Sequence, residues 1–235
     1  MDTIVGFGDS WTFGSELDRP GEQCWLAQLS AQMNVRYCNM STPASSIGHL
    51  TVQLFDFIKQ NPKFEEEQLI FMVGLTGLTR YLSYSNAKNQ FVSITPEAVY
   101  CTEGIHPSGR PPENLPFMDQ LAKQTYALTE DTKYNEFLVA QQIALFQQFC
   151  NYNEIDCIFF SYFDLPMFEN YKHMIVEDLI YPTSITRALT GKEYSIPAIR
   201  ENKYFTGKLF HPNLAGHTRI AELLRDFYDQ KYPRN

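Results

Sequence analysis

The segment 4–14, with the sequence IVGFGDSWTFG, constrains this chain more than any other. Its first four residues form a short apolar run typical of a buried strand, and Gly8 supplies the backbone freedom for a sharp turn at the carboxyl end. In open α/β sheets, ligands bind at the carboxyl ends of the strands. The turn therefore places Ser10 where it can act as a nucleophile, although Asp9 or Ser10 could instead simply cap the next helix.

A second signal lies near the other end of the chain. His211, Pro212 and Asn213 directly precede an apolar-periodic segment that predicts a helix over residues 214–228. A serine is weakly nucleophilic at neutral pH and needs a base within hydrogen-bond reach. An early serine and a late histidine can supply both, so together the two signals favour catalysis over capping.

Strand-like and helix-like segments alternate along the chain, which predicts an α/β protein. We expect strands at residues 3–7, 35–39, 68–74 and 155–160, and helices at residues 25–33, 47–60, 134–151 and 214–228. This order indicates a three-layer α/β/α sandwich with a mainly parallel, flavodoxin-like sheet. With 235 residues, of which 44% are hydrophobic, the whole chain 1–235 is expected to form a single domain.

Two stretches do not fit this minimal plan, and we expect insertions there. Residues 81–133 are rich in proline, serine and tyrosine and lack strong periodicity, so the alternatives are a binding role or a poorly ordered surface excursion. Residues 165–205 carry several tyrosines among charged residues and lead into the histidine motif. We interpret them as a lid or side wall of the site.

Charge and cysteine usage exclude several classes of partner. The net charge of −8 argues against electrostatic binding to nucleic acid or to an anionic membrane. The five cysteines are odd in number and contain no CxxC pair, so reduced thiols are expected rather than a disulfide framework. Three isolated histidines lack metal-ligand spacing, and no metal or cofactor is predicted. These histidines are His49, His106 and His173.

No signal-peptide pattern and no membrane-spanning stretch is recognisable in the sequence. We therefore expect the chain to be cytoplasmic at synthesis. Release, or association with a virion if the chain is encoded by a phage, remains compatible with this expectation.

The two end motifs together resemble those of the SGNH, or GDSL-type, hydrolase family. Residues 8–14, GDSWTFG, fit the first block of the family, and residues 210–217, FHPNLAGH, fit the last. The resemblance implies an esterase-like fold, with Ser10 as the nucleophile and His211 as its general base. The form of the first block also looks like that of compact bacterial and phage members.

The family's two middle blocks build an oxyanion hole, and this chain departs from both. The second-block glycine corresponds to Ala44, with Gly48 as the other candidate, and the third-block asparagine corresponds to Thr76. The resemblance implies that the backbone N–H groups of Ser10 and Ala44 and a contribution from Thr76 would stabilise the oxyanion. Loss of one such donor can lower the rate ~10²–10³-fold, so the threonine at position 76 indicates a weaker oxyanion hole.

The last block departs from the family as well. The aspartate that the family places three residues before the histidine corresponds to Lys208. An ammonium group beside His211 would disfavour the imidazolium that forms during turnover, so Lys208 is expected to point to solvent. Either a dyad operates, or another group such as Asp164 or Glu201 orients the histidine.

Candidate substrate-binding residues are Asp9, Trp11 and Arg80. Arg80 could recognise an anionic or carbonyl group or be a solvated surface residue, and Trp11 could line the cleft with its aromatic face.

Taken together, the residues and the resemblance predict a serine-dependent ester hydrolase that forms an acyl-enzyme. Aromatic and polar loops without an apolar lid suit a small acyl ester, such as an acetylated glycan, so carbohydrate O-deacetylation is our first hypothesis. The alternative is a noncatalytic glycan-binding or structural module on a degenerate scaffold, which Thr76 and Lys208 favour. An acyltransferase would share the acyl-enzyme but exclude water from its second step.

Overall fold

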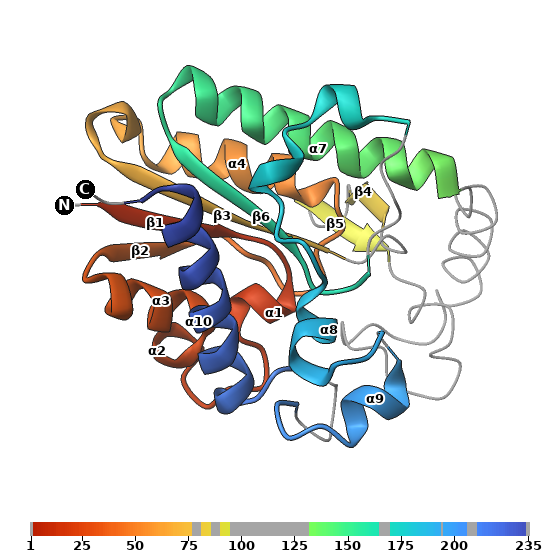
Figure 1. Ribbon diagram of the computed structural model, residues 1–235. Helices are drawn as coiled ribbons and strands as arrows, with labels where there is room; N and C mark the ends of the chain where they lie inside the picture. Colours follow the sequence, from red (N-terminus) through yellow and green to blue (C-terminus); the bar gives the residue numbers. More distant parts are fainter. Residues whose placement is uncertain are drawn as a thin grey trace.

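The computed structural model describes residues 2–76, 81–85, 90–94, 132–164, 170–193, 195–205 and 211–233. At its centre is a parallel four-stranded sheet with the strand order β2-β1-β3-β6 (Figure 1). The strands are β1 (Thr3–Phe7), β2 (Arg36–Asn39), β3 (Leu69–Leu75) and β6 (Asp156–Ser161). Each lies within one residue of its expected bounds, so the apolar runs located the sheet correctly.

Helices cover both faces of this sheet (Figure 1). One face packs against α3 (Trp25–Met33) and α10 (Leu214–Lys231), and the other packs against α4 (His49–Gln60) and α7 (Thr132–Tyr152). Successive strand residues alternate between the two layers: Ile4 belongs to the first cluster and Val5 to the second. This arrangement confirms the three-layer α/β/α sandwich.

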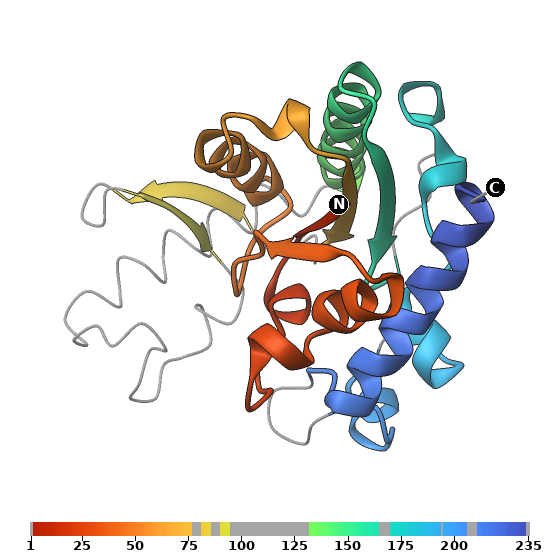
Figure 2. The same cartoon turned by 90° about the vertical axis from the view of Figure 1, so that its left-hand side faces the viewer.

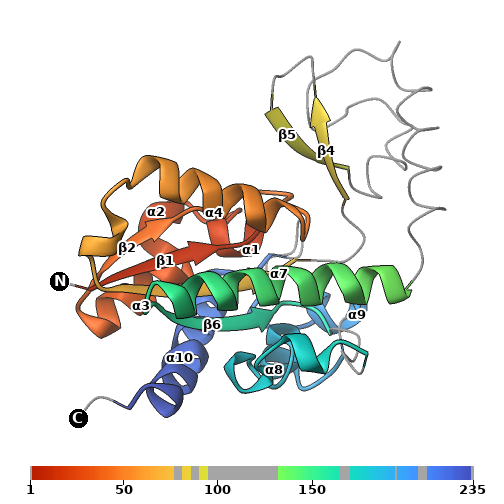
Figure 3. The same cartoon turned by 90° about the horizontal axis from the view of Figure 1, so that it is seen from above.

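An antiparallel hairpin lies within the stretch 81–133, where we expected an insertion without strong periodicity. It consists of β4 (Tyr81–Ser85) and β5 (Gln90–Ile94), which form a sheet of their own. Figures 2 and 3 show the hairpin apart from the central sheet. Of the remaining residues in this stretch, 86–89 and 95–131 lie outside the described part of the chain.

The described residues of the second expected insertion, 170–193 and 195–205, contribute to the core. They include the 3₁₀ turns Lys172–Met174 and Glu177–Leu179 and the short helices α8 (Ile185–Thr190) and α9 (Ile196–Arg200). Ile185 and Ile199 are fully buried in the same cluster as α3 and α10. A single parallel bridge from Ile180 to Phe159 extends the sheet beyond β6. The packing therefore anchors this segment firmly beside the carboxyl end of the sheet (Figure 3).

The cysteines in the described residues are free thiols. Cys24, Cys150 and Cys157 are buried and Cys38 is partly buried, whereas Cys101 lies outside the described residues. Burial raises the pKa of the Cys24 thiol, which keeps it protonated and unreactive. Within the described ranges, no helix is both long enough and apolar enough to cross a bilayer.

Candidate active site

The turn after β1 requires glycine and fixes the position of Ser10. Gly8 has a φ of +151°, and a Cβ at this position would lie 2.3 Å from Thr12 Oγ1. The fully buried Asp9 caps the short helix α1 (Ser10–Phe13) by accepting a hydrogen bond from the Trp11 N–H at 3.0 Å. Asp9 therefore acts as a cap, and Ser10 begins the helix at the carboxyl edge of the sheet.

A buried glutamine on α4 holds this turn in place. Gln53 accepts a hydrogen bond from the Gly8 N–H at 2.9 Å and donates one to the Gly8 carbonyl oxygen at 2.7 Å. Its amide also donates to Ser45 Oγ at 3.1 Å, next to Ala44. Gln53 thus joins the Ser10 turn to the loop after β2. The sequence motifs did not point to Gln53, although a glutamine on the apolar side of an amphipathic helix was the available signal.

The loop after β2 places Ala44 in an unusual backbone conformation. Its φ is +62°, in the left-handed region that costs a non-glycine residue roughly 1–2 kcal/mol. The other candidate, Gly48, has ordinary helical angles as the residue before α4. Of the two candidates, the residue with the glycine-like backbone is therefore Ala44.

Thr76 directly follows β3 and is only 1% exposed. Its Oγ1 has no hydrogen-bond partner among the described residues. Leaving a buried hydroxyl without a partner costs about 1–3 kcal/mol, so such a group is a candidate to bind a ligand atom. Since β3 pairs with β1, Thr76 lies at the same edge of the sheet as the Ser10 turn.

The histidine motif is held at the start of α10. Asn213 caps the helix through a hydrogen bond from the Gly216 N–H to its Oδ1 at 3.0 Å, and its Nδ2 donates to the Lys203 carbonyl oxygen at 2.7 Å. A Cβ on Gly216 would lie 2.2 Å from the Tyr204 carbonyl oxygen. The Pro-Asn and glycine positions of the motif therefore dock the loop that carries His211 onto residues 203–205.

A carboxylate on the segment after Ser10 contacts His211. Glu16 Oε2 lies 3.1 Å from His211 Nδ1, and the two side chains are 14% and 13% exposed. The contact joins the last sequence motif to the segment that directly follows the first motif. Among the described residues, Ser10 Oγ and His211 share no hydrogen bond, which is common in unliganded sites because catalytic hydrogen bonds often tighten only when substrate binds.

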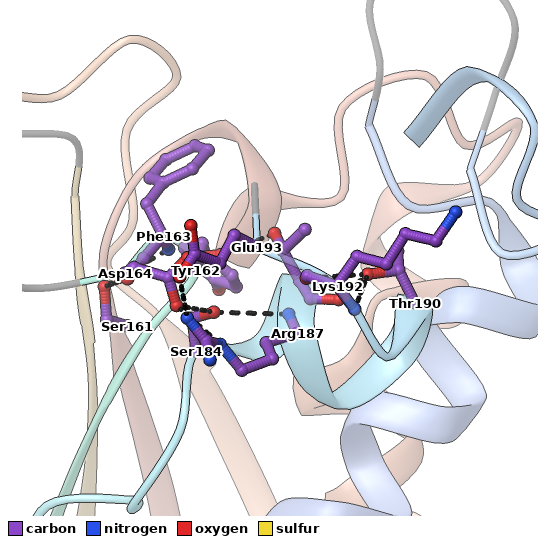
Figure 4. Close-up of polar contacts among 10 residues, drawn as sticks. Ser161, Tyr162, Phe163, Asp164, Ser184, Arg187, Thr190, Lys192 and Glu193 are labelled. Atoms are coloured by element: carbon purple, nitrogen blue, oxygen red, sulfur yellow. Dashed lines mark hydrogen bonds and ion pairs between the residues drawn. The ribbon is translucent and has the colours of Figure 1, made fainter. Parts of the chain in front are cut away.

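Neither carboxylate that we considered as a substitute for position 208 contacts His211. Asp164 accepts hydrogen bonds from Ser184 Oγ at 2.8 Å and from Arg187 Nε at 3.2 Å (Figure 4). Glu201 is an exposed residue at the end of α9. The structure places Glu16 beside His211 instead. We missed it because the family pattern directs attention to the residues just before the histidine.

His217, six positions after His211, has a supporting role inside the protein. It is fully buried, and its Nδ1 accepts a hydrogen bond from the Trp25 N–H at 3.1 Å. Burial, with a smaller contribution from the charge of His211, lowers the pKa of His217 to about 3. This histidine is therefore neutral at physiological pH and carries its proton on Nε2.

The remaining candidate substrate-binding residues are Trp11, which is buried, and Arg80, which is not described. Trp11 is 5% exposed, and its ring packs against Tyr162, Phe163 and Phe205 at centroid distances of 5.0, 5.4 and 5.5 Å. This burial favours a packing role over contact with a substrate. Arg80 lies outside the described residues, as does Lys208.

The described residues also line a cavity of about 670 Å³ that is separate from these motifs. Its lining includes Asp164, Tyr181 and Arg187 but neither Ser10 nor His211. Within the described ranges, no three histidine, cysteine, aspartate or glutamate side chains gather into a group that could hold a metal ion.

The chain matches no family model and no curated protein, but it does match solved structures. An acetyl xylan esterase, Est2A, from the rumen bacterium Butyrivibrio proteoclasticus is 11% identical, with a TM-score of 0.52 over 97% of this chain and 64% of that one. The esterase EstA from Pseudoalteromonas sp. is 12% identical, with a TM-score of 0.49 over 99% of each chain. A protein assigned to the lipolytic G-D-S-L family from Desulfitobacterium hafniense DCB-2 is 14% identical, with a TM-score of 0.48 over 96% of this chain and 98% of that one. The likeness to Est2A confirms the fold that the sequence motifs predicted.

Proposed function

We propose that this protein is a serine-dependent ester hydrolase that works by acyl transfer. One observation carries the proposal: His211, in the last motif, contacts Glu16, two residues beyond the end of the first motif. A serine and a histidine brought to one edge of an α/β sheet, with a carboxylate on the far ring nitrogen, are the components of a nucleophilic catalytic site.

In the proposed reaction, Ser10 Oγ attacks the ester carbonyl carbon while its proton passes to His211 Nε2. The tetrahedral intermediate then collapses, the bond to the alcohol breaks, and the same nitrogen returns the proton to the leaving oxygen. Water repeats the sequence on the acyl-enzyme, which releases the acid and restores the serine.

The negative charge of each tetrahedral intermediate needs donors that already point toward it. The backbone N–H groups of Ser10 and Ala44 and the hydroxyl of Thr76 are the proposed donors. The left-handed backbone of Ala44 supports this assignment, and so does the buried Oγ1 of Thr76, which has no hydrogen-bond partner among the described residues. A threonine hydroxyl can rotate to donate a hydrogen bond to an incoming oxyanion.

For the substrate, we propose a small acyl ester, with an acetylated glycan as the first candidate. The fold match to an acetyl xylan esterase supports this choice. The abundance of tyrosines in residues 165–205 supports it as well, since aromatic rings pack against sugar faces. We propose neither nucleic acid nor membrane as a partner.

The test is hydrolysis of p-nitrophenyl acetate and of acetylated xylan by the purified protein and by the variants Ser10→Ala and His211→Ala. We expect turnover that falls by at least ~10³-fold in each variant. Hydrolysis that is independent of Ser10 would contradict the proposed nucleophile.

The second candidate function is a noncatalytic glycan-binding module. The observation that favours it is the threonine at position 76, where the family's third block has an asparagine donor. Binding of acetylated xylan oligosaccharides without any Ser10-dependent release of acetate would support this alternative.

A further inference from the structure

We propose that Glu16 is the residue that positions His211 for catalysis, in the role that the sequence pattern would assign to an aspartate at position 208. The inference deepens the proposed hydrolase function and rests on it. Glu16 would act through the histidine without touching the substrate, which makes it a positioning residue.

The geometry of the contact determines where His211 carries its proton. An ionised carboxylate can only accept hydrogen bonds, so with Glu16 ionised the Nδ1 of His211, 3.1 Å from Glu16 Oε2, is the donor. The neutral imidazole then has its lone pair on Nε2, the form that a general base requires. When His211 becomes protonated during turnover, the adjacent negative charge stabilises the imidazolium.

Burial strengthens the interaction. The two side chains are only 14% and 13% exposed, so water screens their charges less than it does for the surface ion pairs of this protein. In the ion pair between Arg19 and Glu22, for comparison, the exposed fractions are 66% and 65%. The contact between Glu16 and His211 is thus less exposed to solvent than such surface ion pairs.

The backbone at Glu16 supplies an independent argument. Its φ is +69°, in the left-handed region where glycine and asparagine are ordinarily found. The conformation follows directly from the Ser10 turn, because the Ser15 N–H donates to the Ser10 carbonyl oxygen at 2.9 Å and the Leu17 N–H to the Gly14 carbonyl oxygen at 3.2 Å. A glycine would adopt this conformation with less strain. The side chain therefore supplies the reason for a glutamate here, and that side chain contacts His211.

The test compares Glu16→Gln, Glu16→Asp and Glu16→Gly with the unmodified protein. Glutamine keeps the size of the side chain but can donate a hydrogen bond to Nδ1, which favours the wrong tautomer. We expect kcat for p-nitrophenyl acetate to fall about 10²–10⁴-fold in Glu16→Gln with little change in KM, and aspartate to restore part of the loss. Glu16→Gly relieves the backbone strain, so it should remain folded while losing activity to a similar extent.

A matched control is Glu154→Gln. Glu154 also has a left-handed backbone, with a φ of +55°, but it precedes β6 at the opposite end of the sheet. We expect its substitution to leave kcat unchanged.

A second measurement does not depend on activity. In ¹⁵N NMR spectra of Ser10→Ala, we expect neutral His211 to carry its proton on Nδ1, and the added Glu16→Gln substitution to shift the proton toward Nε2. His217 is an internal reference, because its Nδ1 accepts a hydrogen bond from the Trp25 N–H and its proton is on Nε2 in both samples.

Unchanged kcat in Glu16→Gln, or a His211 tautomer that does not respond to it, would overturn the role of Glu16. If the unmodified protein hydrolyses no ester, the proposed function fails. The NMR spectra then still decide whether Glu16 sets the tautomer of His211.

Discussion

Two carboxylates near the carboxyl edge of the sheet meet very different partners. Glu16, beyond β1, contacts a histidine that lies 195 positions away in the sequence. Asp164, beyond β6, forms an ion pair with Arg187 on the nearby helix α8, where the side chains are 35% and 45% exposed (Figure 4). A guanidinium group stays protonated at all accessible pH values, whereas an imidazole exchanges its proton near neutrality. The partner of Glu16 can therefore exchange a proton near neutral pH, whereas the guanidinium of Arg187 beside Asp164 cannot.

The sharpest test of this difference removes the partner of each carboxylate. His211→Ala should lower kcat by about 10⁴-fold, because the proposed general base is lost. Arg187→Ala breaks the Asp164 ion pair and should leave kcat unchanged. Steady-state kinetics on p-nitrophenyl acetate measure both. Equal losses of kcat in the two variants would contradict the proposed difference between the β1 and β6 regions.

The second prediction concerns the buried histidine His217. His217 is neutral in the folded protein, and its pKa of about 3 lies below the ordinary 6.5, so the unfolded state binds more protons between these values. The contribution of His217 to stability is fully present above about pH 6.5 and is lost as the pH falls toward 3. The difference between 6.5 and about 3 corresponds to roughly 4–5 kcal/mol in the free energy of unfolding.

Urea denaturation between pH 7 and pH 4 measures this dependence. In His217→Gln, where the amide oxygen can still accept the Trp25 N–H, the free energy of unfolding should depend less on pH. An identical pH dependence in this variant would show that His217 is not the responsible group.

The third prediction compares two buried threonines, one in each region. Thr76→Val removes a hydroxyl without a partner among the described residues, so kcat should fall about 10²-fold without loss of stability. Thr186→Val, on α8, removes a hydroxyl that donates to the Tyr162 carbonyl oxygen at 2.6 Å. That substitution should cost about 1–3 kcal/mol of unfolding free energy without affecting kcat. Kinetics and urea denaturation of both variants test the contrast, and a Thr76→Val enzyme with full kcat would contradict the oxyanion assignment.

The fourth prediction compares two buried glutamines that hold backbone segments by paired hydrogen bonds. Gln53 holds Gly8 beside Ser10, whereas Gln147 on α7 bonds the Val176 N–H at 2.8 Å and the Val176 carbonyl oxygen at 2.9 Å beside β6. Leucine at either position should lower the free energy of unfolding by about 1–3 kcal/mol. Only Gln53→Leu should also lower kcat, about tenfold, because it loosens the turn that carries the nucleophile. Equal kcat values in both variants would argue against a positioning role for Gln53.

Most of the central fold could be predicted from the sequence, because buried strands and amphipathic helices are local patterns. The expected strand 3–7 and helix 25–33 coincide with β1 and α3. The hairpin formed by β4 and β5 was missed, since its short strands pair with each other away from the core and show no strong alternation. A strand whose partner is another short, separate strand leaves little signal in its own residues.

The candidate site was predictable only in part. Ser10 and His211 stand in recognisable motifs, and Ala44 and Thr76 could be found by their alignment with the family's blocks. Glu16 could not, and Gln53 offered only the weak signal of a glutamine on the apolar side of a helix, because both residues make contacts far away in the chain. Such contacts are set by the docking of the histidine loop and of α4 onto the Ser10 turn, and no local pattern encodes them.

The most direct test of the central claim is labelling with a fluorophosphonate, which reacts with an activated serine nucleophile. After exposure of the unmodified protein, mass spectrometry should find one adduct per chain, on Ser10. The adduct should be absent from Ser10→Ala and strongly reduced in His211→Ala. A protein that stays unlabelled, or that carries the adduct on another residue, would contradict the account.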